Sequence, residues 1–183
     1  DNVGPLTRTV EDNALMLQTI AGHDPADPAS APRPVDDYMD SLKSGVKGLK
    51  IGLIRHFYNE DMIADEEMTA GIENAAKLLE SMGAEVREIR LPPLSQYAAC
   101  NRVILLSEAY AIHQKDLQTR PGDYSATTRR RLLPGAFMSG ADYVNATRMR
   151  EKLVAAFNEA MQGLDAAVTV SSHETPANLS DMQ

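Results

Sequence analysis

The chain has 183 residues, of which 43% are hydrophobic, and its 18 basic and 26 acidic residues give a formal net charge of −8. This size and composition suit one domain, or a large part of one, with a substantial core. The acidic balance argues against a nucleic-acid-binding domain and against attachment to an anionic membrane, because both usually require a basic face.

The first predicted element is a helix over residues 9–21. Thr9 can cap its N-terminus, with Asp12 three residues later in the position of a capping box. Gly22 is typical of a helix end. Residues 23–36 hold four prolines and no helical period. We therefore expect them to form an extended connection on the surface.

The next elements predict a strand, a helix and a second strand. Residues 49–54 form an almost continuous apolar run, which is typical of a central parallel strand covered on both faces. An apolar stripe with the period of 3.6 residues predicts a helix over 65–82. Residues 84–91 predict a second strand. Its alternation of apolar and polar residues is interrupted, which indicates an edge strand or a bulge. Together the three elements predict a βαβ unit.

The remainder is predicted to be mainly helical. A helix over 94–117 is apolar almost all round at its centre, which predicts that it is largely buried. We expect Glu108, inside it, to pair with an arginine or to accept backbone hydrogen bonds; the alternative is a role in an active site. A shorter helix is predicted around "SATTRRRLL", a capped helix over 140–162, and a third strand near 165–170.

No complete catalytic or metal-binding set is evident from the residues. The four histidines lie far apart in the sequence, and no His-Glu-x-x-His or paired-cysteine spacing occurs, so we expect no metal. We expect no cofactor either, because no glycine-rich turn links a strand to a helix. Cys100 is expected to be an inert core thiol. A relay among Ser171, Ser172, His173 and Glu174 is disfavoured, because neighbouring side chains on an extended segment point to opposite faces.

One cluster remains as a candidate binding site, the arginines Arg129, Arg130 and Arg131. Guanidinium groups bind carboxylates through two parallel hydrogen bonds. On a helix the three side chains point about 100° apart, so at most two of them can face one pocket. The alternative is a solvated face with ion pairs to the acidic surface.

Several stretches resemble, in order, the amidase signature family of Ser-cisSer-Lys amide hydrolases. The opening "DNVGPLTRTVEDNALMLQTIAGHDPADP" resembles the segment just after the family's catalytic core. Later matches are "VKGLKIGLI", "LLESMGAEVREIRLP", "SEAYAIH", "RRRLLPGAFMSGADY" and "DAAVTVSSHETPA". The resemblance implies an α/β fold in which residues 1–183 form a single partial domain. It implies a partial amidase-signature fold, with a mixed sheet of the three predicted strands surrounded by helices.

The resemblance also implies a reaction and a substrate-side role. In this family one serine attacks the amide carbon, and a second serine on a cis peptide bridges it to a lysine base. These residues lie upstream of the opening motif, and no Gly-Gly-Ser-Ser-Gly run occurs in this chain. We therefore assign no catalytic residue and expect the chain alone to be inactive. In amidotransferase-like members an arginine of an "RRxxxG" helix holds the substrate's α-carboxylate. The matching residues are Arg130 and Arg131, followed by Gly135.

The expected function is therefore that of a portion of an amidase acting on a small amide, with no nucleic-acid or membrane partner. One alternative is the A subunit of glutamyl-tRNA(Gln) amidotransferase. Val170 argues against this alternative, because it stands where the family's "TPT" motif has a proline. The other is a non-catalytic binding module. Open sheet edges would allow a homodimer. The sequence contains no secretory signal and no apolar run of about 18 residues, so we expect a cytoplasmic location.

Overall fold

The computed structural model describes residues 3–28, 30–40, 42–178 and 180. The chain forms two units, Asp1–Lys47 and Gly48–Gln183. Each unit is described separately.

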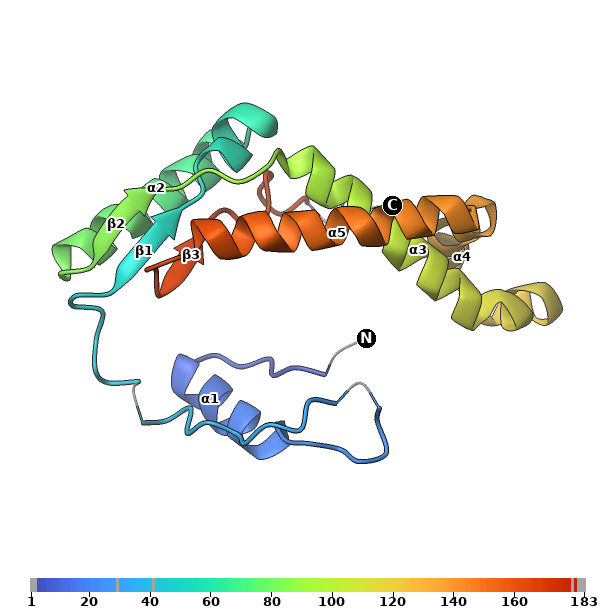
Figure 1. Cartoon of the computed structure of the whole chain (residues 1–183), viewed down its shortest axis with the longest axis horizontal. Coiled ribbons are helices and arrows are strands. Elements are labelled where there is room, and N and C mark those ends of the chain that lie inside the picture. The colour runs from blue at the N-terminus through green and yellow to red at the C-terminus, as the bar shows by residue number, and fades with distance from the viewer. Residues whose placement is uncertain (1–2, 29, 41, 179, 181–183) are drawn as a thin grey trace. The chain divides into compact units, whose positions relative to one another are not determined.

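Among its described residues the first unit contains one helix, α1 (Val10–Ile20) (Figure 1). The predicted cap is confirmed, because the Thr9 hydroxyl oxygen accepts a hydrogen bond from the Asp12 N–H at 3.0 Å. The described residues among 23–36 form turns and extended backbone without a helix or strand, as the prolines predict.

The second unit is built on a three-stranded sheet with the order β2-β1-β3. The strands are β1 (Lys50–Leu53), β2 (Glu85–Glu88) and β3 (Ala166–Val168), and β1 pairs parallel with both neighbours. The helix α2 (Glu66–Ser81) connects β1 to β2. The predicted βαβ unit is therefore confirmed. The most apolar strand, β1, lies at the centre of the sheet, and β2, whose apolar alternation is interrupted, lies at an edge.

The core of this unit lies between the sheet and α2 (Figure 1). Leu53 of β1 is 2% exposed, and it packs with Tyr58, Ala64 and Ala76. Tyr58 belongs to a π-helical turn, η1 (Phe57–Asp61). Burial of these side chains supplies much of the free energy that holds α2 on the sheet.

A helical arm follows the sheet and carries the arginine cluster. Its elements, in chain order, are α3 (Leu94–Thr119), η2 (Pro121–Asp123), α4 (Ala126–Leu132), η3 (Leu133–Phe137) and α5 (Gly140–Ala160). Cys100 and Ile104 of α3 pack against Ala146 and Leu153 of α5, so α5 crosses α3 along an apolar seam (Figure 1). The predicted cap of this helix is confirmed, because Ser139 and Asp142 form a capping box at the start of α5.

The prediction that α3 is largely buried is wrong. Among the described residues of α3 only Cys100, Ile104 and Leu117 are buried, and Ile112 is 76% exposed. The predicted partner of Glu108 is also wrong, because its exposed carboxylate accepts a hydrogen bond from the Tyr143 hydroxyl at 2.9 Å. The physical reason is that α5 and the α4–η3 segment cover only part of the circumference of α3.

Candidate functional site

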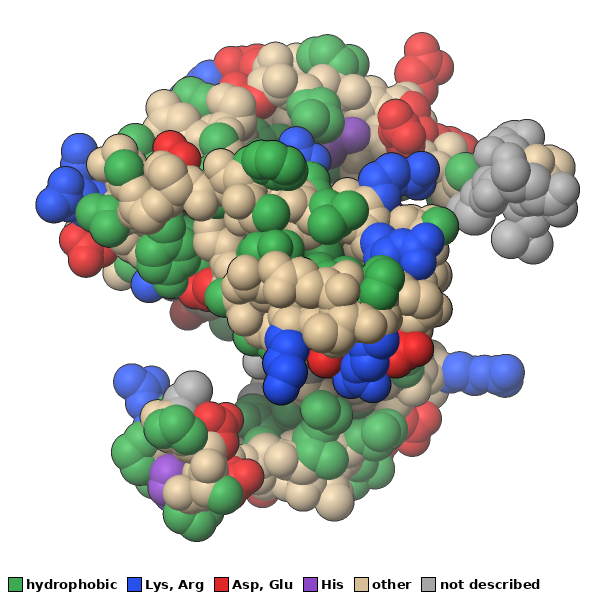
Figure 2. All heavy atoms as spheres, turned by 90° about the vertical axis from the view of Figure 1, so that its right-hand side faces the viewer, with side chains coloured by type: hydrophobic (Ala, Val, Ile, Leu, Met, Phe, Trp, Pro, Cys, Tyr) green, Lys and Arg blue, Asp and Glu red, His purple; other side chains and the backbone are tan. Residues whose placement is uncertain are grey.

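The arginines of α4 lie beside a hollow on the surface of α3. Arg130 and Arg131 line it together with Arg102, which comes from α3, and its volume is about 560 Å³. The remaining lining is apolar and consists of Leu105, Leu106, Pro134 and Met138. Figure 2 faces the end of the arm that carries α4, and it shows basic side chains beside hydrophobic ones on that face.

Local structure decides which arginines reach the hollow. The Ser125 hydroxyl caps α4 by accepting a hydrogen bond from the Thr128 N–H at 3.1 Å. Arg129 turns away, because its guanidinium donates to the carbonyl oxygen of Pro121 at 2.7 Å. Arg130 and Arg131 remain, which agrees with the prediction that at most two of the three can face one pocket.

Gly135 sets the distance between the two sides of the hollow. It is buried, and a Cβ atom there would lie 2.2 Å from the carbonyl oxygen of Leu106 and 2.5 Å from the Cβ of Tyr110. The backbone of η3 therefore rests directly on α3, and only a glycine permits this approach. This contact brings Arg130 and Arg131 to the same hollow as Arg102.

Carboxylates of the described residues hold three other arginines of the chain but not those of the hollow. Arg55, Arg90 and Arg120 each form ion pairs with carboxylates. Within the part of the chain that the structure describes, none of the three arginines that line the hollow has a hydrogen-bond or ion-pair partner. Their guanidinium donors therefore face solvent or a ligand, and the ion pairs of the alternative, a solvated face, are not found among the described residues.

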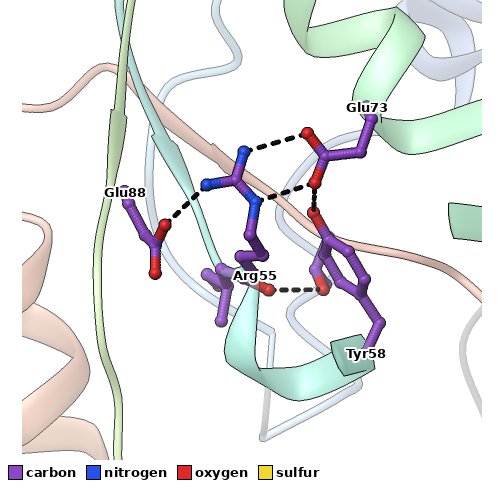
Figure 3. A network of polar contacts seen from close by, with 6 residues as sticks. Arg55, Tyr58, Glu73 and Glu88 are labelled. Atoms are coloured by element: carbon purple, nitrogen blue, oxygen red, sulfur yellow. Dashed lines mark hydrogen bonds and ion pairs between the residues drawn. The ribbon is translucent and has the colours of Figure 1, made fainter. Parts of the chain in front are cut away.

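A second polar cluster, shown in Figure 3, lies at the end of β1. The Arg55 guanidinium donates two hydrogen bonds to Glu73, at 2.7 and 2.9 Å, and one to Glu88 at 2.6 Å. The Tyr58 hydroxyl donates to Glu73 at 2.7 Å. Ligands of α/β folds often bind at the carboxyl ends of strands. Here the charges satisfy one another, so the cluster links β1, α2 and β2 instead of presenting a free group.

These contacts shift the protonation equilibria of the cluster. The hydrogen bond from Arg55 lowers the pKa of Glu73, because it favours the ionised carboxylate. Burial, and then the hydrogen bond to Glu73, raise the pKa of Tyr58 to about 12. The Tyr58 side chain, 1% exposed, is therefore neutral at physiological pH.

Replacing Glu73 by Gln is expected to reduce the free energy of unfolding by about 1 kcal/mol at neutral pH. The folded state lowers the pKa of Glu73 below 4.5. Its stabilising effect is therefore present above that pH and is lost as the pH falls through the folded-state value. The free energy of unfolding, measured with urea between pH 3 and 7, should thus fall less steeply toward low pH in Glu73→Gln than in the unmodified chain.

The control for this experiment is Glu80→Gln, an exposed residue on the same face of α2 as Glu73 whose carboxylate forms no ion pair with the described residues. This variant retains the ion pairs of Arg55 with Glu73 and Glu88, and it should therefore keep the loss of stability at low pH that follows from protonation of Glu73. If the free energy of unfolding fell as steeply toward low pH in Glu73→Gln as in Glu80→Gln, the stabilisation could not be assigned to the contacts of Glu73 with Arg55.

The segment after β3 contains no catalytic relay among its described residues. The Ser172 hydroxyl donates to the carbonyl oxygen of Glu174, whereas the His173 ring lies with Nε2 3.0 Å from the carbonyl oxygen of Phe57. The Asp65 carboxylate accepts a hydrogen bond from the Thr175 N–H at 2.7 Å. These bonds hold the segment against η1 and the start of α2, which is a structural role.

The described ranges contain neither a metal site nor a helix long and apolar enough to cross a bilayer. No group of three or more His, Cys, Asp or Glu side chains there has the geometry to hold a metal ion. The Cys100 thiol is buried and donates to the carbonyl oxygen of Ala146 at 3.2 Å, as expected for a core cysteine.

Sequence comparison relates the chain to proteins about two and a half times its length. A family model described as Amidase matches residues 1–183. An amidase of Pseudomonas putida is 38% identical, over 92% of this chain and 36% of its own length. The A subunit of the glutamyl-tRNA(Gln) amidotransferase of Pelobacter propionicus is 33% identical, over 92% of this chain and 39% of its own length. The chain thus spans little more than a third of these relatives.

Solved structures show the same relation in three dimensions. A crystal structure of an amidase superposes with a TM-score of 0.69 at 28% identity, over 90% of this chain and 33% of its own. A vestigial protein complex related to the origins of an s-triazine catabolic enzyme superposes with a TM-score of 0.78 at 28% identity, over 88% and 34%. The native peptide amidase of Stenotrophomonas maltophilia gives a TM-score of 0.64 at 26% identity, over 90% and 39%.

Proposed function

The chain belongs to the Amidase family, and from this premise we propose that the protein containing it hydrolyses carboxamide C–N bonds through a serine acyl-enzyme. The observation that carries the proposal is the match of the family model over residues 1–183. In this reaction the serine oxygen bonds to the amide carbon, the C–N bond breaks, and the amine leaves with a proton. Water then hydrolyses the acyl ester and restores the serine.

We assign to this segment a role on the substrate side of that reaction. Arg130 and Arg131 would hold a carboxylate of the substrate, away from the bond that breaks. Their lining of one hollow and their lack of partners among the described residues support this role. A carboxylate held there would orient the amide for attack, because binding energy from a remote group is used to position the reacting one.

The large exposed apolar side chains of the arm fit a segment of a larger fold. Phe137 is 87% exposed and Ile112 is 76% exposed. Surfaces of this kind usually pack against other protein. We propose that the remainder of the amidase domain covers them, and that the serine and lysine groups of the reaction come from that remainder.

A second candidate function is that of a component of a glutamyl-tRNA(Gln) amidotransferase. The 33% identity to the A subunit of that enzyme from Pelobacter propionicus favours it, whereas the 38% identity to the Pseudomonas putida amidase favours an independent amidase. Purification of the tagged longer protein from its own cells separates the two. Stoichiometric partner proteins would support the amidotransferase, and their absence would support the amidase. Whether the protein forms a homodimer stays a prediction, to be read from its mass in the same preparation.

We expect the 183-residue chain to release no ammonia or amine from simple amides. It has no Gly-Gly-Ser-Ser-Gly run to supply the serine pair of the family. The measurement compares the chain with the longer protein that includes the upstream serine loop. Turnover by the chain alone would contradict the assignment of the chemistry to residues outside it.

Replacing Arg130 or Arg131 by Ala in the longer protein is expected to raise KM about tenfold for amides that carry a carboxylate. Each substitution removes charge-assisted hydrogen bonds to the substrate. KM for a neutral amide should not change. The matched control is Arg148→Ala, an exposed arginine of α5 outside the hollow. Unchanged KM values for both Arg130→Ala and Arg131→Ala would remove these residues from the substrate site.

A further inference from the structure

We propose that Arg102 completes a three-arginine site with Arg130 and Arg131, and that the site binds an organic acid with two carboxylates joined by a short hydrocarbon segment. The claim that this site binds a substrate rests on the proposed function, and the substrate would then be an amide bearing two carboxylates. The claim that the site binds an organic acid rests only on the residues that line the hollow.

The placement of Arg102 follows from the helix period and one close backbone contact. Arg102, Leu105 and Leu106 are spaced i, i+3 and i+4, so they share one face of α3. The carbonyl oxygen of Leu106 is also the atom against which Gly135 packs. The contact that seats η3 on α3 therefore brings the face of Arg102 to the hollow that Arg130 and Arg131 line.

The charges around the hollow favour an anionic ligand. Three cations line it, and within the described part of the chain no carboxylate pairs with them, although the chain as a whole carries a net charge of −8. Arginine side chains that share one hollow repel one another. An anion bound between them relieves that repulsion and gains charge-assisted hydrogen bonds.

The number of donors favours two carboxylates over one. An ionised carboxylate offers about four acceptor positions, whereas three guanidinium groups present about fifteen N–H donors in rigid forks. A single carboxylate can be held by two forks and leaves the third without a partner. A second carboxylate on the same ligand would pair with the third arginine, which we assign as Arg102.

The apolar lining favours a hydrocarbon between the two charges. Leu105, Leu106, Pro134 and Met138 supply it. Methylene groups that contact these side chains leave water, which makes binding of the hydrocarbon segment favourable. Inorganic phosphate carries a comparable charge but has no such groups, so its binding tests whether charge alone is sufficient.

The experiment measures binding of small acids to the 183-residue chain by NMR titration at fixed ionic strength. The probes are glutarate, butyrate and inorganic phosphate. We expect glutarate to bind at least tenfold more tightly than butyrate, which has one carboxylate on a chain of similar length, and more tightly than phosphate. Equal binding of glutarate and butyrate, or tighter binding of phosphate, would overturn the proposal.

Two variants assign the effect to Arg102. Arg102→Gln should lower glutarate affinity about tenfold and leave butyrate affinity nearly unchanged, because the remaining arginines still hold one carboxylate. Arg148→Gln should change neither, because Arg148 lies outside the hollow. Both residues are exposed, so both variants should keep the circular dichroism spectrum of the chain. A glutarate affinity unaffected by Arg102→Gln would sink the assignment.

Kinetics of the longer protein separate this proposal from the proposed function. If the chain binds glutarate as expected and the longer protein hydrolyses no amide, the site stands and the amidase function fails. If the longer protein hydrolyses amides but Arg102→Gln leaves the KM for a dicarboxylate amide unchanged, the function stands and the three-arginine site fails.

Discussion

A methyl group at position 135 is expected to destabilise the chain by about 1–3 kcal/mol and to abolish acid binding in the hollow. In Gly135→Ala the new Cβ would have to lie 2.2 Å from the carbonyl oxygen of Leu106. That neighbour is backbone within α3, so it cannot rotate away as the end of a side chain can. The η3 turn must therefore lift off α3, which separates Arg130 and Arg131 from Arg102.

Urea unfolding and the glutarate titration together test this expectation. The matched control is Gly71→Ala in α2, where an added Cβ meets no atom within 4 Å. That variant should be as stable as the unmodified chain or slightly more stable, because alanine is the better helix former. If Gly135→Ala bound glutarate normally, the close approach of η3 would not be what forms the hollow.

Replacing Leu53 by Ala is expected to reduce the free energy of unfolding by about 2–5 kcal/mol. Leu53 is 2% exposed and lies on the central strand, where it contacts the cluster that includes Tyr58 and Ala76. The substitution removes buried methyl groups and leaves a cavity between the sheet and α2. Because β1 pairs with both other strands, the loss affects the only described sheet of the chain.

The measurement is the urea midpoint, with Leu78→Ala as the control. Leu78 lies on α2 and is 59% exposed, so its replacement should change the free energy of unfolding by less than about 1 kcal/mol. Equal destabilisation by the two substitutions would mean that the cluster around Leu53 is not the core of the second unit.

Much of the fold could be predicted because its signals are local. The Thr9 cap of α1 and the capping box at Ser139 depend on residues within one helical turn, so both could be read from the sequence. The central position of β1 followed from its continuous apolar run. The family resemblance, which the match over residues 1–183 supports, depended on short motifs and on their order along the chain, and both can be read without a structure.

The burial of α3 could not be predicted from the same kind of signal. An apolar composition on all sides predicts burial only if neighbours cover all sides. Ile112 and Leu105 are exposed because α5 lies on one flank of α3 and the α4–η3 segment on another. Glu108 likewise pairs with Tyr143, a partner that sequence distance did not suggest.

The sequence by itself determined the α/β class, the positions of the strands and most helix ends, and the family. It also showed the cluster of Arg129, Arg130 and Arg131, which is visible without a structure, and the resemblance to the family narrowed this cluster to Arg130 and Arg131. Only the tertiary structure placed Arg102 beside them. That placement depends on the contact of Gly135 with the α3 backbone, and a contact between residues far apart in the chain leaves no local pattern to read.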